Sequence, residues 1–514
     1  MERIQAIFNS LSRQELRYLK SFLNAFHGKG SNKALALLEL LEKQPDLTQA
    51  DASEKLYGNP KSKAFIMLKA RLLEKMQETL ILGVNLQNNN VLKEDPAAYE
   101  VVRIIKQISS ALMLRKRGLE DIARELFEKC EHQAEEAGLP EFRLPPLIYL
   151  QNIAASRQKG TWEYSGEIAK TLEQYETDVL GIGIFDEFNL KTRNHSHFSE
   201  EVIEWLREKT KQLEKRLEVA YTLRTHYFYL NLLVSMYEGI QDYEQAKGAL
   251  EELIDLVSSN KGLRSKNRLG TPYLKLAAVE CLVYNFPAAL EASLNARELY
   301  HPKKYNYFSA SLYALFIQLY LGEWKAAEQM LLELQWFRNQ KRRTQSIELT
   351  YYLEACLKHL QGDCKAAFQS LGLLQEILAD KKGWNSSMRI YEIMLLLDMD
   401  MFDLAASRIE SLRKHLAKYR GEDRHAKIFR YLYLLEKHAF DFQTRDDEMH
   451  ELEQWMRLSD SWKAISHEVI RFDLWIQAKK ENTGLAEAFT QSFFNPKTSL
   501  DFEAGEMSKI DVVD

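Results

Sequence analysis

One pattern recurs along this chain about every 40 residues, within the range of helical repeat arrays, and it constrains the fold more than any other feature. Its clearest copy is Gly322-Glu323-Trp324-Lys325-Ala326-Ala327, in which a polar residue and an aromatic residue precede a small residue, and Leu331 and Leu334 follow. The small residues that anchor the copies are Ala123, Ser165, Ala246, Ala289, Ala327, Ala367 and Ala405. Subtracting successive anchor numbers gives 42, 81, 43, 38, 40 and 38. The period is regular if the longest interval holds one degenerate copy.

Each position of the pattern has a physical reason. The residue four before the anchor is polar in five copies: Thr161, Asp242, Asn285, Glu323 and Asp363. Four of these side chains suit an N-cap, where they accept a backbone N–H, and Glu323 suits the helix dipole. The aromatic residue lies one turn before the anchor on the same helix face, and the apolar positions continue that face. A small anchor lets a neighbouring helix approach closely. The pattern therefore predicts one amphipathic helix per period, preceded by another helix.

These copies resemble the second helix of the tetratricopeptide repeat, whose Gly-x-aromatic-x-x-Ala turn matches Gly322, Trp324 and Ala327. Leu230, Leu233 and Tyr237 fit the first helix of one copy. The resemblance covers residues 96–494 and implies an all-α fold, a right-handed α-solenoid of helical hairpins. HEAT or armadillo arrays, whose repeats are about 40–47 residues long, remain an alternative.

The composition agrees with an extended helical array. A chain of 514 residues exceeds one compact core, and 10 prolines and 21 glycines suit long helices. The net charge of −5 excludes a globally basic nucleic-acid binder. Four scattered cysteines form no disulfide framework, so we expect small core residues in a reducing compartment. The N-terminus has no apolar signal core, and no apolar run approaches the roughly 18 residues that suggest a membrane span, so we expect a cytoplasmic protein without a membrane partner.

Residues 1–92 differ from the repeats and predict a small N-terminal helical domain of four or five helices, followed by a linker. Residues 48–58 and 59–76 resemble the helix-turn-helix portion of a winged-helix domain. The second of these helices carries Lys61, Lys63, Arg71 and Lys75, which would contact phosphates and base edges in a recognition helix. Around that helix, however, the basic side chains spread widely outside the apolar stripe. A solvated face on a capping domain is therefore the alternative to nucleic-acid binding.

The other expected helix boundaries follow from the positions of prolines and glycines and from the loss of helical periodicity. Pro145 and Pro146 are expected to interrupt the helices around them, and residues 180–198 are expected to be irregular. Two weaker helix pairs are expected at about 423–459 and 461–494. Residues 495–514 lose periodicity and are expected to form a disordered tail.

The candidate catalytic and metal motifs are incomplete. His195 and His197 have no further ligands at a suitable spacing, and zinc sites need three or four. Gly28-Lys29-Gly30-Ser31 resembles the end of a phosphate loop but lacks its first glycine and a preceding strand. We therefore expect no enzyme activity, no cofactor and no metal.

Two sets of residues are candidates for partner binding. Loops that follow the anchored helices are basic, above all at Arg338, Lys341, Arg342 and Arg343, and would form a positive rim for an acidic partner. Complementarity to helix dipoles is the alternative explanation. Aromatic residues of the first helices, among them Phe228, Phe316 and Tyr352, would serve as anchors in a groove, unless they pack in the core.

Three functional hypotheses remain. The first is a non-catalytic scaffold that holds a protein or peptide partner on the first helices of the array. The second is a transcriptional regulator whose N-terminal domain binds DNA while the array senses a partner. The third is an enzyme with residues gathered from distant repeats, for which no constellation is present in the sequence.

Overall fold

The computed structural model describes residues 1–11, 13–25, 32–44, 47–82, 95–156, 163–192, 198–339, 345–374, 382–419, 423–457, 462–464 and 466–494. All regular elements in these ranges are helices, and none of the described residues forms a strand. The described chain divides into two compact units, residues 1–176 with 260–265 and residues 177–259 with 266–514. The predicted all-α class is confirmed.

The first unit begins with five helices. They are α1 (Glu2–Ser10), α2 (Arg13–Ala25), α3 (Lys33–Lys43), α4 (Gln49–Tyr57) and α5 (Lys63–Leu82). Leucines of α2 and α3 pack against Phe65 and Met76 of α5 in a core of their own. Thr48 caps α4 by accepting the N–H of Asp51, and Gly58 ends that helix with a φ of 65°. The number of helices agrees with the sequence prediction, while the boundary of the domain at residue 92 lies outside the described residues.

The same unit contains the first helical hairpin. Helix α7 (Pro96–Lys116) packs on α8 (Glu120–Glu136), which packs on α9 (Pro140–Ser156), and α10 (Ser165–Thr192) begins in this unit. Pro145 and Pro146 lie inside α9, so the expected interruption there is wrong. They fall in the first half of the helix, where the missing backbone donors affect only one stretch of the hydrogen-bond ladder.

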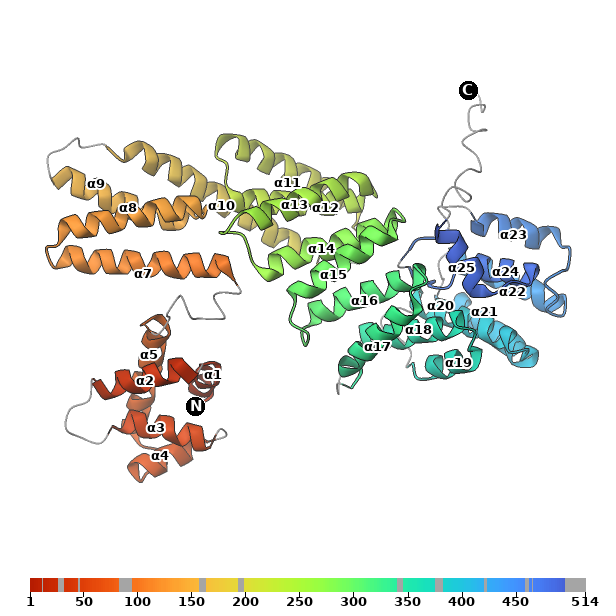
Figure 1. Ribbon diagram of the computed structural model, residues 1–514, viewed down its shortest axis with the longest axis horizontal. Coiled ribbons are helices and arrows are strands. Elements are labelled where there is room, and N and C mark those ends of the chain that lie inside the picture. The colour runs from red at the N-terminus through yellow and green to blue at the C-terminus, as the bar shows by residue number, and fades with distance from the viewer. Residues whose placement is uncertain are drawn as a thin grey trace. The chain divides into compact units, whose positions relative to one another are not determined.

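The second unit is an array of helical hairpins in which each helix packs on the next (Figure 1). Its helices after α10 are α11 (Glu200–Val219), α12 (Leu223–Gly239), α13 (Tyr243–Ser259), α14 (Lys266–Leu282), α15 (Phe286–Leu299), α16 (Tyr305–Tyr320), α17 (Trp324–Arg338), α18 (Gln345–Leu360), α19 (Cys364–Gly372), α20 (Trp384–Asp398), α21 (Phe402–Tyr419), α22 (Asp423–Lys437), α23 (Asp447–Arg457), α24 (Phe472–Glu481) and α25 (Leu485–Phe494). We call α12, α14, α16, α18, α20 and α22 the first helices of their hairpins.

One turn geometry connects the two helices of six repeats among the described residues. A residue with positive φ follows the first helix, and the next residue donates its N–H to a carbonyl five positions back, as in Glu323 N to Gln318 O at 2.9 Å. The positive-φ residues are Gly118, Gln241, Tyr284, Gly322, Gly362 and Asp400. Each directly precedes the residue that opens a copy of the sequence pattern. The repeat register predicted from the sequence is therefore confirmed at these turns.

The anchor residues also behave as expected. The six alanine anchors are fully buried, as are Phe127, Leu250 and Leu253 at the apolar positions that follow them. The predicted caps hold at Asp242 and Asp363, whose side chains accept the N–H groups of residues 245 and 366. The remaining positions vary more.

Two parts of the predicted pattern need correction. Asn285 caps no backbone N–H and instead donates to Glu280 Oε2 at 2.9 Å. Trp324 is only half-buried, and Phe402 is 42% exposed and stacks on Phe440 at the surface of its hairpin. Thr161 and Trp162 lie outside the described residues.

The long interval between the anchors Ser165 and Ala246 contains a long helix in place of the expected irregular segment. Residues 180–192 belong to α10, which has 28 residues. Its C-terminal half packs with α11 and α12 around Ile184, Phe188 and Leu206. Gly181 is needed there, since a Cβ on it would lie 2.9 Å from Thr225 Oγ1 of α12. At Gly181, the glycine that suggested a break therefore allows close helix packing.

The end of the array also differs from expectation. Helices α22 and α23 form the expected hairpin, but residues 462–464 and 466–471 are not helical. We call these residues the internal segment. Beyond it, α24 and α25 do not extend the array, because α25 returns to pack on α16 (Figure 1). The predicted tail, residues 495–514, lies outside the described residues.

Candidate functional site

Five successive first helices, or the turns that follow them, carry a row of residues in contact with the internal segment. These residues are Tyr284, Tyr320, Tyr352, Trp384 and Arg424, and we call them the first-helix face. They lie just after α14, at the end of α16, within α18, and at the N-terminal ends of α20 and α22. The row thus crosses the helices diagonally. Because the hairpins repeat, each contributes one side chain to the same surface.

Trp462 begins the contact between the internal segment and this face. Its ring stacks on Tyr284 with centroids 6.0 Å apart and meets Tyr320 edge-on at 5.9 Å. The Tyr284 hydroxyl donates to the Trp462 carbonyl oxygen at 3.1 Å. Next to it, Lys463 donates to Gln241 Oε1 at 2.8 Å. Trp462 is consequently only 3% exposed.

The middle of the segment contacts the next two first helices. The imidazole of His467 meets the Trp384 ring edge-on, with centroids 5.0 Å apart. The Tyr352 hydroxyl donates to the His467 carbonyl oxygen at 3.4 Å. Two tyrosine hydroxyls thus bind backbone carbonyls of the segment, a mode of recognition that does not depend on the side chains of the bound chain.

Glu468 forms a charged contact with Arg424 of α22. Its two carboxylate oxygens accept from Nε and Nη2 of Arg424, the latter at 2.8 Å, and its backbone carbonyl accepts from Trp462 Nε1 at 2.8 Å. Arg424 also donates to Asp473 Oδ1 at 3.0 Å. Burial would raise the pKa of Asp473, but Arg471 and Arg424 hold it below its ordinary value. The bidentate pairing fixes this end of the segment in register with α22.

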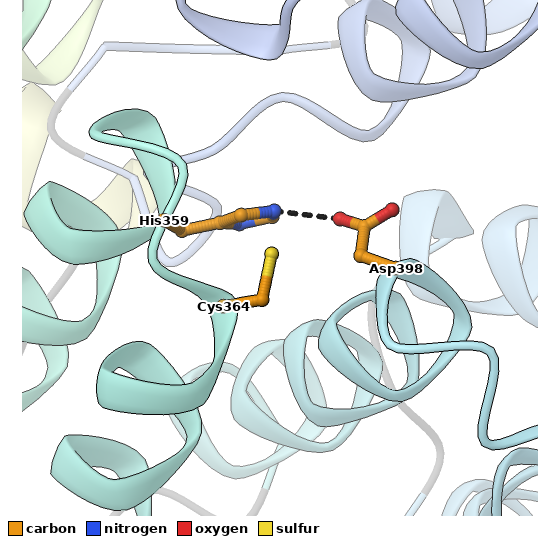
Figure 2. Close-up of side chains that lie close together, drawn as sticks. All are labelled: His359, Cys364 and Asp398. Atoms are coloured by element: carbon orange, nitrogen blue, oxygen red, sulfur yellow. Dashed lines mark hydrogen bonds and ion pairs between the residues drawn. The ribbon is translucent and has the colours of Figure 1, made fainter.

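A second cluster joins α18, α19, α20 and α24. His359 in the last turn of α18, Cys364 at the start of α19 and Asp398 at the end of α20 place ligand-type atoms within 4.8 Å of one another (Figure 2). His359 Nε2 and Asp398 Oδ2 are 2.6 Å apart. Trp475 and Lys479 of α24 approach the same carboxylate at 3.0 and 2.5 Å.

The charges of this cluster explain its arrangement. Burial would raise the pKa of Asp398, but the hydrogen bond from His359 and the charge of Lys479 hold it below its ordinary value of 3.8. Burial, with the charge of Asp398, raises the pKa of the Cys364 thiol. A zinc ligand would have to be a thiolate, and Lys479 already supplies the positive charge that the carboxylate needs. The cluster therefore fits a polar contact between helices better than a metal centre.

The cavity beside this cluster has a cause in the repeat pattern. It measures about 410 Å³ and is lined by His359, Cys364, Asp398, Trp475 and Lys479 among others. Cys364 occupies the position that is aromatic in five other copies, so the small side chain leaves space there. The sequence alone did not predict this cluster. His359 lies four residues before Asp363 and Asp398 three residues before Met401, so the two are one position out of register and the repeat pattern did not predict the pair.

The predicted basic rim is only partly described. Arg338 lies at the end of α17 and is 9% exposed along its side chain. It donates to Thr350 Oγ1 and Glu354 Oε2 at 2.8 and 2.7 Å, and its guanidinium lies 4.4 Å from the centre of the Tyr351 ring. Arg338 therefore joins α17 to α18 and is not an accessible rim charge. Lys341, Arg342 and Arg343 lie outside the described residues.

The predicted aromatic anchors are mostly in the interior. Phe316 is 4% exposed and Tyr352 is 1% exposed, so Phe316 is a core residue and the ring of Tyr352 is covered. Sequence reasoning missed that the Tyr352 hydroxyl reaches the internal segment. Phe228 is half-buried and stacks on Phe185 of α10 at 4.8 Å, which leaves its role in binding a prediction.

The candidate nucleic-acid residues remain at the surface of the N-terminal helices. Lys61, Lys63 and Arg71 are exposed, whereas Lys75 is half-buried and forms an ion pair with Glu78 at 2.7 Å. No strand occurs among the described residues of this part of the chain, so the wing of a winged-helix domain is not among them. His195 and His197 also lie outside the described residues.

These helices, turns and buried anchors define an all-α solenoid of tetratricopeptide-like hairpins. No protein-family model and no curated protein matches the chain. Among solved structures, the chain is similar to a signal transduction ATPase with numerous domains from Pyrococcus horikoshii that has a tetratricopeptide repeat sensor. The identity is 13% and the TM-score 0.32, over 78% of this chain and 66% of that one. At this score the likeness supports no inference, and the class rests on the hairpins themselves.

The match spans slightly under two thirds of the Pyrococcus chain. Across the described helices, none is both long and apolar enough to cross a bilayer.

Proposed function

We propose that the protein is a non-catalytic scaffold that binds a non-helical segment of a partner protein on the first-helix face. The observation that supports this function is the internal segment itself. It lies across five successive hairpins, and two of its backbone carbonyls accept hydrogen bonds from tyrosines of the face. A surface that holds one non-helical segment in this way has the chemistry to hold another.

The test is a selection of peptides from a random display library on the full-length chain. Enriched peptides are then titrated against two variants that change the same turn position in different hairpins. Tyr284→Asn removes a ring and a hydroxyl of the face at a φ of 61°, and Asp400→Asn is its control at 57°. Asparagine tolerates this backbone conformation, so both variants should fold.

Both changes are made in Trp462→Ala protein, in which the internal segment has lost its own ring contact with Tyr284. In that background we expect Tyr284→Asn to weaken binding at least about tenfold, which corresponds to the loss of one good contact of about 1.4 kcal/mol. Adding Asp400→Asn should leave binding like that of Trp462→Ala alone. A library that yields no binder, or peptides that bind both variants alike, would contradict the proposed function.

The second candidate function is that of a regulator that binds DNA through its N-terminal helices. Lys61, Lys63 and Arg71 are exposed and therefore accessible to DNA, which supports this second candidate function. Duplex DNA titrated against the full-length protein at low salt tests it, and replacing the three residues with Gln should weaken binding and flatten its salt dependence. Absence of binding at tens of micromolar protein would remove this candidate. We further propose a cytoplasmic location, in keeping with the four free cysteines.

A further inference from the structure

The internal segment has the properties of a bound ligand more than those of a structural linker. Its described residues form no helix, and Val469 and Ile470 are 0% and 2% exposed. Its contacts with the face come from residues far away in sequence, 178 positions in the case of Tyr284 and Trp462. In a helix, backbone N–H groups of the same helix would bind the carbonyls. Here the tyrosine hydroxyls of the face donate to two of the segment's carbonyls instead.

Two side chains fix the segment along the face. Trp462 contacts the rings of Tyr284 and Tyr320, and Glu468, six positions later, pairs with Arg424. The ring contacts are sequence-selective for an aromatic group, and the bidentate pairing is selective for a carboxylate. A chain that replaces the segment must supply a carboxylate in the place of Glu468, since Arg424 is buried with that carboxylate and Asp473 as its partners.

An internal ligand also competes with any external one. A tethered segment acts at an effective concentration in the millimolar range for a short flexible connection. A free peptide with the same contacts then binds with an apparent affinity reduced by the fraction of molecules whose face is open. Strengthening or weakening the internal contact therefore changes the affinity for every external ligand.

We propose that the internal segment is an autoinhibitory occupant of the first-helix face, displaced by a partner peptide of matching chemistry. That peptide is non-helical and bent like the internal segment, in which Trp462 Nε1 donates to the Glu468 carbonyl oxygen at 2.8 Å. It carries an aromatic side chain, followed at the spacing of Trp462 and Glu468 by a carboxylate and then by two aliphatic residues. This inference rests on the proposed function and adds to it the ligand class and its regulation.

The experiment uses a fluorescent peptide with the sequence of residues 461–472, titrated into the full-length chain. Trp462→Ala in the protein removes the aromatic contact of the internal segment but leaves the face intact. We expect this variant to bind the peptide at least about tenfold more tightly than the parent does. A control peptide with Ala and Gln in place of Trp462 and Glu468 should not bind either protein.

A tethered variant covers the case in which Trp462→Ala does not fold. Gln241 and Lys463, whose side chains are in contact, are both replaced by Cys and joined by a bismaleimide that contains a disulfide. The tether holds the segment on the face, so the peptide should bind at least about tenfold more weakly than after the linker has been cleaved by reduction.

Equal affinity of the tethered and cleaved proteins would overturn the inference, as would a peptide that binds neither the parent nor Trp462→Ala. Peptides selected from the random library test the proposed function separately. If those peptides bind and respond to Tyr284→Asn while tethering has no effect, the face binds ligands and only autoinhibition is wrong.

Discussion

The fully buried alanines show how little freedom single residues have in this array. Ala327 is 0% exposed and lies where α17 meets its neighbours in the main core. A leucine side chain there must move a helix or adopt a strained rotamer, because protein interiors are close-packed.

We therefore expect Ala327→Leu to lower the free energy of unfolding by about 1–3 kcal/mol. Lys325→Leu, on the exposed side of α17, is the control and should change it by less than about 0.5 kcal/mol. Denaturant unfolding followed by circular dichroism measures both. Equal midpoints for the two variants would mean that the anchor does not contact its neighbours as described.

Asp398 allows a prediction about pH. Its folded pKa is lowered below 3.8, so its contribution to stability is present above that value and is lost as the pH falls through the folded pKa. His359, Trp475 and Lys479 face the carboxylate, and all three would lose a charged acceptor in Asp398→Asn.

We expect Asp398→Asn to be less stable than the parent by about 1–3 kcal/mol at pH 7, the cost of leaving buried partners without their acceptor. The two proteins should converge as the pH falls below 3.8. Thermal unfolding at several pH values measures the difference. If the difference in stability between the parent and Asp398→Asn stays constant at all pH values below 3.8, the charge of Asp398 is not what stabilises this cluster.

Among the elements, α10 shows where inference from sequence alone fails. Gly181 and Gly183 suggested an irregular segment, but both are helical, and only Gly181 is crowded. A Cβ on Gly181 would lie 2.9 Å from Thr225 Oγ1, which is itself hydrogen-bonded to Asp178 Oδ1 at 3.0 Å. Replacing each glycine with alanine should therefore change the stability of the protein in opposite directions.

Gly181→Ala should be destabilising by about 1–3 kcal/mol, because Thr225 cannot move without breaking its hydrogen bonds. Gly183→Ala, with open space around its Cβ, should stabilise by up to about 1 kcal/mol through the helix propensity of alanine. Melting temperatures of the two single variants measure this difference in sign. Two variants that shift in the same direction would show that α12 does not pack against Gly181.

The sequence predicted those features that depend on neighbours along the chain. The turn before Glu323, the cap at Asp363 and the buried anchors follow from local backbone chemistry and helical periodicity, which act within one hairpin. The internal segment and the contacts of Arg338 do not, because they depend on residues from other hairpins. Periodicity suggested that residues 461–494 were one more helix pair, but the internal segment at the start of this range is not helical.

At the scale of the whole molecule, most of the second unit consists of contacts between successive helices. Arrays of this kind are quasi-one-dimensional, and each repeat is stabilised mainly by the repeats beside it. The internal segment is an exception, since its hydrogen bonds join residues 178, 115 and 222 positions apart.

Those bonds have a consequence for folding. A purely local array can lose terminal repeats one at a time, but a segment that connects α14 to α22 makes the hairpins between them open together. The closure of so long a loop also raises the mean sequence separation of contacts, which slows folding. We expect amide hydrogens of α14–α22 to exchange as one cooperative unit in the parent and as several units of graded protection in Trp462→Ala. Graded protection in the parent would show that the segment does not couple these hairpins. Exchange as one unit in the parent, and as several in Trp462→Ala, would show that the short internal segment makes their opening cooperative.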